Sequence, residues 1–157
     1  MLNSAGSGTW SSVICGINFV TSKAPANSGP ITVANMSLGG SGADDEDCGK
    51  TNNDALHKAI CNSVAAGVTY VVAAGNETDD VKNHVPAAYN EVITVSALAD
   101  SDGKACGAGS ATGYGTDYTF ASFSNYATLA SDFGHLIAAP GVSIYSTYKG
   151  GAYATLS

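Results

Sequence analysis

The segment from residue 31 to residue 74 constrains the fold most strongly, because it places an amphipathic stretch between two apolar runs. Residues 31–38 are rich in β-forming side chains and stop at two glycines, which is typical of a buried strand. Residues 68–74 are apolar without alternation, as in a strand that is covered on both faces. A strand, a helix and a strand of these lengths predict a right-handed parallel crossover.

The amphipathic stretch, residues 53–67, is the clearest helix signal in the sequence. Its core-facing positions repeat at intervals of three and four residues, and they are Leu56, Ala59, Ile60, Ser63 and Val64. We expect Asn53 to cap the start of this helix and Gly67 to follow its end in a left-handed conformation. A first helix is predicted over residues 10–20, with Thr9 as its N-cap.

Three further short strands are predicted, at residues 91–97, 136–139 and 142–146. Between the first two lies a Gly-rich polar excursion, residues 100–118, which we expect on the surface. With 157 residues and 45% hydrophobic content, the chain can bury one ordinary core. The sequence therefore predicts one α/β domain with a mostly parallel sheet.

Charge and hydropathy exclude several classes of partner. The chain has six lysines, no arginine, thirteen acidic residues and a net charge of -7, and no lysine cluster could follow a phosphate backbone. We therefore expect no nucleic-acid partner. No apolar run reaches the roughly 18 residues of a membrane span, and the first twenty residues lack the pattern of a signal peptide. We expect no membrane partner and no export signal in this sequence.

The four cysteines leave two interpretations open. They are Cys15, Cys48, Cys61 and Cys106, too few for a disulfide-built scaffold and without the Cys-x-x-Cys pair of a zinc site. The low charge and acidic composition suit an extracellular protein, in which a bridge such as Cys48 to Cys61 persists. The alternative is four buried free thiols.

Ligands of parallel α/β sheets bind beyond the carboxyl ends of the strands, where the loops converge. Two such ends stand out, and they resemble segments of the subtilisin-like serine protease family. The motifs that carry the resemblance are Asn35-Met-Ser-Leu-Gly-Gly40, Val71-Val-Ala-Ala-Gly-Asn-Glu77, Pro86-Ala-Ala-Tyr-Asn-Glu-Val-Ile-Thr-Val95, Phe120-Ala-Ser-Phe-Ser-Asn125 and Ala138-Ala-Pro-Gly-Val-Ser-Ile144. The resemblance implies a partial peptidase domain over residues 1–157, whose mostly parallel sheet has helices on both faces.

The resemblance assigns one catalytic residue, Asn76, which corresponds to the family's oxyanion-binding Asn. Its side-chain amide would donate a hydrogen bond to the oxyanion of the tetrahedral intermediate, and so stabilise charge that develops only in the transition state. An Asn after a Gly is by itself typical of a turn. The surrounding motifs favour the catalytic interpretation.

The same resemblance implies an extended peptide or protein substrate that pairs with exposed backbone. The residues expected to bind it are Gly8, Ser37, Leu38, Gly39, Ala73, Ala74, Gly75 and His84. The segments around Ser37 and Ala74 would form the two walls of the primary specificity pocket. We expect His84 near the floor of this pocket, although a lone loop histidine is more often a solvated side chain. Gly8 would lie at a more distant subsite, beside Trp10 and Val13, which could equally be core residues.

The family's catalytic triad is not expected in this sequence. Its Asp and His motifs would precede the segment, and its Gly-Thr-Ser-Met-Ala run would begin after Ser157. His57 is expected on the surface of its helix, and neither it nor His84 or His135 is expected to act as a base. The chain could then be an inactive part of a secreted serine endopeptidase, a shortened hydrolase with weak esterase activity, or a non-catalytic peptide-binding module. Uncovered apolar faces would favour self-association.

No cofactor is expected to be required, but a structural calcium or monovalent cation is compatible with the sequence. The loop at residues 86–92 resembles one whose main-chain carbonyls hold such a cation in relatives. The acidic run from Asp44 to Asp47 lacks the alternating spacing of a calcium loop and is expected to be a solvated acidic face.

Overall fold

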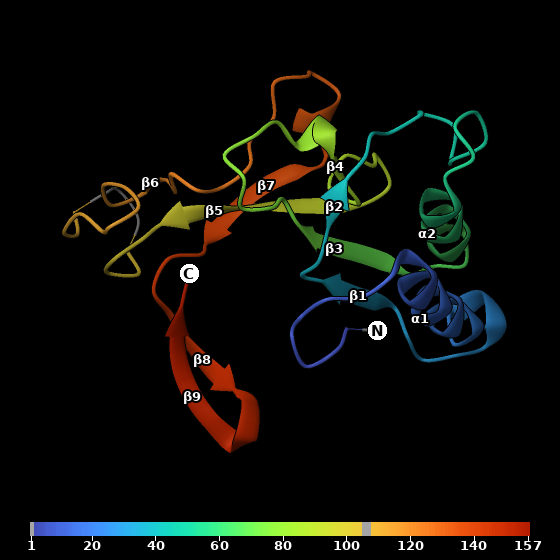
Figure 1. The fold of residues 1–157 in the computed structure, drawn as a ribbon, viewed down its shortest axis with the longest axis horizontal. Coiled ribbons are helices and arrows are strands. Elements are labelled where there is room, and N and C mark those ends of the chain that lie inside the picture. The colour runs from blue at the N-terminus through green and yellow to red at the C-terminus, as the bar shows by residue number, and fades with distance from the viewer. Residues whose placement is uncertain (1, 105–107) are drawn as a thin grey trace.

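A computed structural model describes residues 2–104 and 108–157 and contains one mainly parallel sheet (Figure 1). Its strands are β1 (Val33–Met36), β3 (Thr69–Ala73), β5 (Ile93–Ala99), β6 (Thr119–Phe120) and β7 (Leu136–Pro140). The parallel pairs are β1 with β3, β3 with β5 and β5 with β7, while β6 pairs antiparallel with the end of β5. This confirms the predicted α/β class.

The predicted parallel crossover is confirmed between β1 and β3, with α2 (Ala55–Ala65) as its helix. The expected cap is wrong by one residue, because Asp54 rather than Asn53 accepts hydrogen bonds from the backbone amides of Leu56 and His57. A carboxylate is the stronger acceptor for these amides. Gly67 follows the helix with a φ of 96°, as expected.

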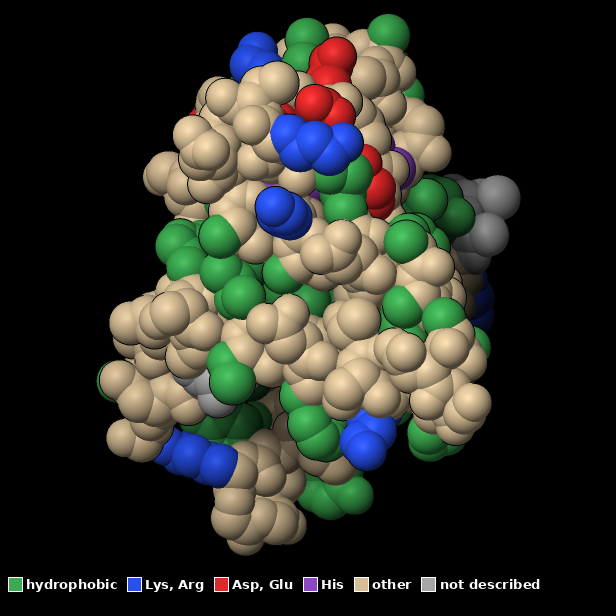
Figure 2. Space-filling model, turned by 90° about the vertical axis from the view of Figure 1, so that its right-hand side faces the viewer, with side chains coloured by type: hydrophobic (Ala, Val, Ile, Leu, Met, Phe, Trp, Pro, Cys, Tyr) green, Lys and Arg blue, Asp and Glu red, His purple; other side chains and the backbone are tan. Residues whose placement is uncertain are grey.

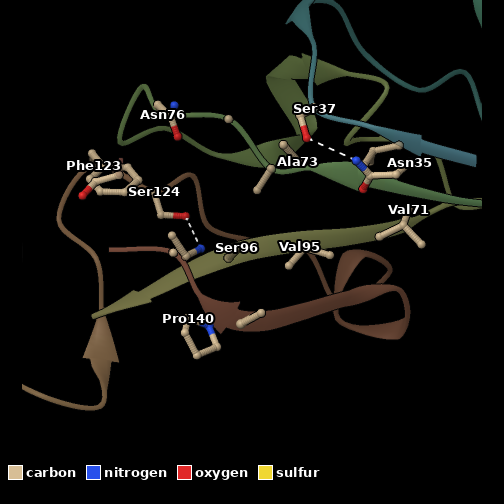
Figure 3. A pocket seen from close by; sticks show the side chains of 17 residues that line it. Asn35, Ser37, Val71, Ala73, Asn76, Val95, Ser96, Phe123, Ser124 and Pro140 are labelled. Carbon is tan, nitrogen blue, oxygen red and sulfur yellow. Dashed lines mark hydrogen bonds between the residues drawn. The ribbon is translucent and has the colours of Figure 1, made fainter. Parts of the chain in front are cut away.

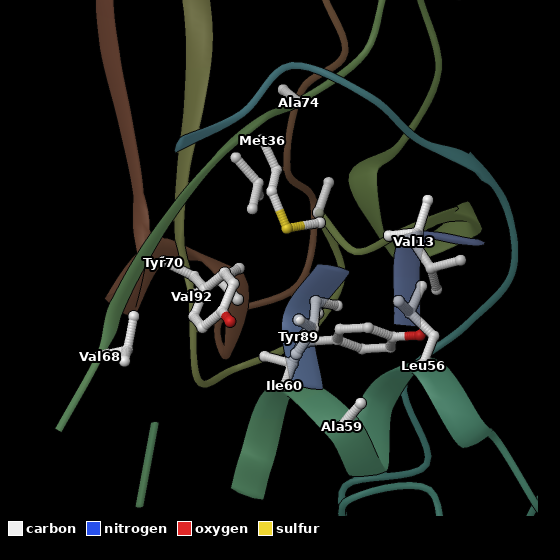
Figure 4. Packing of buried hydrophobic residues seen from close by; sticks show 14 of the residues in the cluster. Val13, Met36, Leu56, Ala59, Ile60, Val68, Tyr70, Ala74, Tyr89 and Val92 are labelled. Atoms are coloured by element: carbon white, nitrogen blue, oxygen red, sulfur yellow. The ribbon is translucent and has the colours of Figure 1, made fainter. Parts of the chain in front are cut away.

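The first helix, α1 (Trp10–Ser22), also begins as predicted, because the Thr9 side chain accepts a hydrogen bond from the amide of Ser12. Helices α1 and α2 lie against the same face of the sheet (Figure 1). The core between them and the strands is shown in Figure 4, which labels residues from both helices and from β1 and β3. Among the described residues, the α-helical cover of the sheet thus lies on one face.

The opposite face of the sheet differs from expectation. Residues 31–38 were expected to form a buried strand and residues 68–74 one covered on both faces, but burial alternates along β1 and β3. Val33 is 60% exposed, Ile93 37% and Ile137 54%, whereas Tyr70 and Val72, which face the helices, are each 1% exposed. Successive side chains of a strand point to opposite faces, so cover on one side buries every second residue.

Short elements complete the described chain. A two-residue strand β2 (Gly40–Ser41) pairs antiparallel with β4 (His84–Val85), and β8 (Ile144–Tyr148) forms a hairpin with β9 (Ala152–Leu156). The predicted strand at 142–146 is thus observed from residue 144. Turns of 3₁₀ helix occur at Pro25–Asn27, Val81–Asn83, Asp132–Gly134 and Lys149–Gly151. Over the described ranges, no helix has the length and hydropathy of a membrane span.

A disulfide joins Cys48 to Cys61, which confirms the bridge among the two interpretations of the cysteines. Cys15 is an exposed free thiol, so it is not the buried one that the alternative required. Cys106 falls outside the described residues. The bridge ties the irregular segment 41–54 to the middle of α2.

Next to this bridge, His57 corrects the expectation that it lies on the helix surface. Its side chain is fully buried, with Nδ1 3.1 Å from Asp45 Oδ1 and Nε2 2.9 Å from Glu91 Oε2. Its ring stacks on Tyr89 at a centroid distance of 4.0 Å. Its contacts with two carboxylates thus place a polar side chain in the interior, where helical periodicity alone would not predict one.

The acidic run at residues 44–47 is likewise more than a solvated face, because the side chain of Asp45 is buried. Burial acts to raise the pKa of Asp45, but hydrogen bonds from the amides of Gly49 and Asp47 and from Thr51 outweigh it, so its pKa falls well below the ordinary value. Figure 2 shows the side of the molecule that carries α1 and α2. The visible acidic side chains gather at the upper end of this view, and segment 41–54 lies at the same height in Figure 1. The solvated interpretation holds only for the exposed Glu46 and Asp47.

Candidate functional site

Three clefts meet at the carboxyl ends of β1 and β3, where the sequence analysis placed the site. The open cleft, of about 480 Å³, lies on the uncovered face of the sheet (Figure 3). The narrow cleft, of about 170 Å³, lies between residues 37–40 and residues 73–77. The distal cleft, of about 570 Å³, lies between residues 6–10 and residues 37–39. Ser37 lines all three clefts, so they form one continuous region.

Asn76 lies on the loop that leaves β3 and lines both the open and the narrow cleft. The residue is exposed, and Figure 3 shows its side chain on the loop above the cleft, on the same side as Phe123. Its backbone amide donates to Glu77 Oε2 at 2.8 Å. No described residue accepts a hydrogen bond from the Asn76 side-chain amide, so this donor is free to bind a ligand in the cleft.

The walls of the narrow cleft are the residues that the sequence analysis named. Ser37, Leu38 and Gly39 line one side and Ala73, Ala74 and Gly75 the other. The two segments are close because β1 and β3 are adjacent, with Met36 opposite Val72 in the register. The wall formed by Ala73, Ala74 and Gly75 consists of small residues, which leave its backbone accessible to a ligand chain.

His84 lines the same narrow cleft and is not a solvated histidine. Its Nε2 lies 3.1 Å from Asp79 Oδ2 and its Nδ1 3.7 Å from Glu77 Oε2. The pKa of Asp79 is lowered by hydrogen bonds from the backbone amide of Asp80 and from the side chains of Asn83 and His84. The His84 ring in the narrow cleft thus lies between the carboxylates of Glu77 and Asp79.

Gly8 lies at the distal cleft, which Trp10 and Val13 also line. Val13 is 2% exposed and belongs to the main core, whereas Trp10 is 38% exposed. The structure thus separates the two residues that the sequence left undecided. Trp10 presents its ring to the cleft region, and Val13 packs mainly as a core residue.

Asn125 is a residue of the site region to which the sequence analysis gave no role. It is fully buried, and its side chain bonds to the loop that carries Asn76. The only sequence signal was its place at the end of the motif Phe120-Ala-Ser-Phe-Ser-Asn125. A buried Asn whose amide makes several bonds to one loop cannot be recognised before the loop's position is known.

One pocket of about 300 Å³ offers oxygen ligands to a cation. Ala88 and Asn90, from the loop expected to hold a cation, line it together with Asp132. Asp132 is 4% exposed, and its Oδ2 is a buried acceptor without a hydrogen-bond partner in the described chain. Hard cations such as calcium take carboxylate and carbonyl oxygens. These residues therefore fit a structural cation.

Two of the three other groups of metal-binding residue types in the described chain lie around His57, and their side chains already bond to partners within the protein. Cys48 and Cys61 lie near His57 and Glu91, but their sulfurs are joined in the disulfide. The Asp45 carboxylate near His57 accepts hydrogen bonds from the amides of Asp47, Gly49 and Thr51. Neither group offers a free ligand set.

Comparison with known proteins gives consistent matches. The model of the subtilase family matches residues 1–157. A cuticle-degrading serine protease of Arthrobotrys oligospora is 38% identical over 148 residues, which cover 94% of this chain and 28% of that protein. Alkaline serine exoprotease A of Vibrio alginolyticus is 33% identical over 157 residues, covering 100% of this chain and 23% of that protein.

Solved structures agree with these relatives. A cold-adapted subtilisin-like serine proteinase superposes with a TM-score of 0.70 at 32% identity, covering 100% of this chain and 45% of that one. Sphericase superposes with a TM-score of 0.74 at 26% identity, covering 46% of its chain. The chain thus spans about a quarter of the length of these two relatives and under half of these solved chains.

Proposed function

The chain belongs to the subtilase family, and from this premise we propose that it forms the oxyanion-binding and substrate-binding part of a serine peptidase catalytic domain. The observation that carries the proposal is Asn76, whose side-chain amide has no hydrogen-bond partner among the described residues and which lines two adjoining clefts. In peptide hydrolysis, attack on the scissile carbonyl places negative charge on its oxygen. A preorganised amide at that point stabilises the charge without having to reorient.

The proposed substrate is an extended peptide that lies along Ser37, Leu38 and Gly39. These three residues line both the narrow and the distal cleft, so they run between the two. Side chains of an extended peptide alternate in direction, which allows neighbouring residues to enter different clefts. Gly8 offers its backbone on the other side of the distal cleft, and His84 is one of the residues that line the narrow one.

The test of the proposal is Asn76→Ala in the full-length protein that carries this sequence. We expect kcat for a peptide amide substrate to fall by about 100- to 1000-fold with KM little changed, which is the range known for the corresponding donor in subtilisin itself. Asn62→Ala is the matched control, because Asn62 is an exposed Asn on α2 outside the three clefts. Equal kcat for Asn76→Ala and the control would overturn the proposal.

Phosphonate labelling with mass mapping on the chain of 157 residues separates the proposal from its two alternatives. A modified serine within these residues would indicate a shortened hydrolase with esterase activity. If neither the chain of 157 residues nor the full-length protein is labelled, but the chain binds a peptide measurably, the result would indicate a peptide-binding module. Label on a serine outside residues 1–157 in the full-length protein is the result we expect.

We also propose that Asp132, with Ala88 and Asn90, holds a structural calcium or monovalent cation. The buried Oδ2 without a partner supports this, because a bound cation would compensate its desolvation. A cation that binds only the folded chain raises its melting temperature. Calcium or sodium should therefore stabilise the wild-type protein more than Asp132→Asn.

An extracellular location for the whole protein is part of the proposal, and the Cys48–Cys61 disulfide supports it. We further propose that the uncovered face of the sheet is buried in the working protein, against additional polypeptide or a second copy. The exposed apolar side chains of Val33, Ile93 and Ile137 support this.

A further inference from the structure

Asn125 connects the central sheet to the loop that carries Asn76. Its backbone carbonyl accepts a hydrogen bond from Ser96 Oγ of β5 at 2.9 Å, and its backbone amide donates to the carbonyl of Gly75 at 3.1 Å. Ser96 is 1% exposed and Asn125 is fully buried. Ser96 and Asn125 therefore both lie in the packed interior rather than at the surface.

The side chain of Asn125 uses both of its polar atoms on the same loop. Oδ1 accepts hydrogen bonds from the amides of Glu77 at 2.9 Å and Asp79 at 3.0 Å. Nδ2 donates to the carbonyl of Ala74 at 3.0 Å and to Glu77 Oε2 at 2.7 Å. One buried amide thus binds the loop on both sides of Asn76.

Glu77 extends this connection to Asn76 itself. The same Oε2 that accepts from Asn125 Nδ2 also accepts from the backbone amide of Asn76 at 2.8 Å. The side chain of Asn76, in contrast, has no partner in the described chain that could fix it. Its position therefore depends on its backbone, which Glu77 and Asn125 hold.

Gly75 makes the close approach of Asn125 feasible. Its φ is +106°, and a Cβ at this position would lie 2.4 Å from Asn125 Nδ2 and 2.5 Å from Glu77 Oε2. Any larger residue would push the Asn125 amide away from the loop. The glycine before Asn76 is thus required for the contact as well as for the turn.

We propose that Asn125 is a positioning residue for peptide hydrolysis, which holds the Ala74–Asp79 loop so that the Asn76 amide stands at the cleft mouth before substrate binds. This inference rests on the proposed function of Asn76. Preorganisation of the oxyanion donor matters because reorientation during the reaction would cost transition-state stabilisation. A misplacement of about 1 Å can reduce a rate by about 100-fold.

The experiment uses Asn125→Asp in the full-length protein, with steady-state kinetics on a peptide amide substrate. The substitution keeps the size and the acceptor oxygen but removes the Nδ2 donor and places a carboxylate beside Glu77 Oε2. We expect kcat to fall by about 10- to 100-fold, with KM within about 3-fold of wild type. Asn27→Ala is the control, because the Asn27 amide also donates to a backbone carbonyl, that of Thr21, at a distance from the clefts.

The pH dependence of kcat distinguishes the positioning role from a general loss of stability. Two adjacent carboxylates share a proton more readily than either binds one alone, and a protonated carboxyl can again donate to its neighbour. The ratio of kcat for Asn125→Asp to that of wild type should therefore rise as pH falls. A pH-independent ratio, or a kcat equal to wild type, would overturn the positioning role.

A second variant covers the case in which Asn125→Asp does not fold. Glu77 is 56% exposed, so Glu77→Ala leaves the core intact while it removes the acceptor shared by Asn76 and Asn125. We expect a kcat about 3- to 10-fold below wild type, since a charge-assisted hydrogen bond is lost. An unchanged kcat in Glu77→Ala would count against the inference.

Amide hydrogen exchange separates this inference from the function on which it rests. If Asn125 holds the loop, Asn125→Asp should speed exchange at the Asn76 amide by about 10-fold or more, while Tyr70 and Val72 in β3 exchange as in wild type. This outcome can occur even if Asn76→Ala leaves kcat unchanged. In that case the proposed function of Asn76 fails, but the role of Asn125 in holding the Ala74–Asp79 loop, the loop clamp, is supported. Unchanged exchange at Asn76 together with a large kcat loss in Asn76→Ala would overturn the clamp alone.

Discussion

The two faces of the central sheet differ in what covers them. Tyr70 and Val72 of β3 pack under α1 and α2 and are each 1% exposed. On the opposite face, Val33 and Ile137 are 60% and 54% exposed although they are equally apolar. The same strands therefore carry apolar side chains on both faces, but the described residues bury them fully only on the helix side.

This difference separates the region that supplies the stability of the chain from the region of the proposed site. The covered face supplies most of the hydrophobic core. Next to it, the Cys48–Cys61 disulfide and the contact of His57 with Asp45 link the segment 41–54 to α2. The uncovered face carries the open cleft, with Asn76 at its edge. Substitutions should therefore affect stability on one face and association or catalysis on the other.

The largest contrast is expected between two Ile→Ala substitutions. Ile60 is fully buried under the sheet, so Ile60→Ala should lower the free energy of unfolding by about 2–5 kcal/mol. In the chain of 157 residues, Ile137→Ala removes the same atoms from the uncovered face and should cost less than about 1 kcal/mol. Urea denaturation of the two variants measures the contrast, and similar losses would show that the second face is also buried.

The disulfide beside the covered face should give the next largest effect. Replacing Cys48 and Cys61 together by Ser opens a link between residues 13 positions apart, which typically costs about 3 kcal/mol of unfolding free energy. Cys15→Ser is the control, because Cys15 is an exposed free thiol and its loss should be near neutral. A double variant as stable as the control would mean that segment 41–54 contributes little to the folded unit.

Acid should weaken the covered side through Asp45. The folded-state pKa of its carboxyl lies below the ordinary value of 3.8, so its contribution to stability is complete above that pH and is lost as pH falls through the folded value. Wild type and Asp45→Asn should therefore differ most at neutral pH, and the difference should narrow progressively as the pH falls below 3.8. A constant difference across this range in thermal unfolding would contradict the assigned hydrogen bonds.

The smallest effect on stability is expected from Val33→Thr on the uncovered face. The side chain is 60% exposed, so the free energy of unfolding should change by less than about 0.5 kcal/mol. Self-association of the chain, measured by sedimentation, should weaken because the apolar patch shrinks. A sharp monomeric melting transition and monomeric sedimentation of the unsubstituted chain would argue against exposure of that face.

Sequence patterns identified the elements that local chemistry specifies. Thr9 caps α1, residues 53–67 contain α2, and the strand ends near Ser37 and Ala74 meet at one cleft as expected. The catalytic role of Asn76 and the binding roles of its neighbours stay predictions, since they depend on a bound substrate. His57 could not be placed from its helix alone, because its partner Glu91 is 34 residues away in the sequence.

The sequence by itself determined the α/β class, the parallel crossover and the motif segments, since these follow from hydrophobic period, turn residues and short spacings. Only the tertiary structure decided which face of each strand is covered, that Asp45 and His57 are paired in the interior, and that Asn125 clamps the Asn76 loop. The physical reason is the distance in sequence between the residues that interact. Helices and strands depend on interactions among sequence neighbours, whereas the Asn125–Ala74 and His57–Glu91 hydrogen bonds form only when residues 51 and 34 positions apart meet.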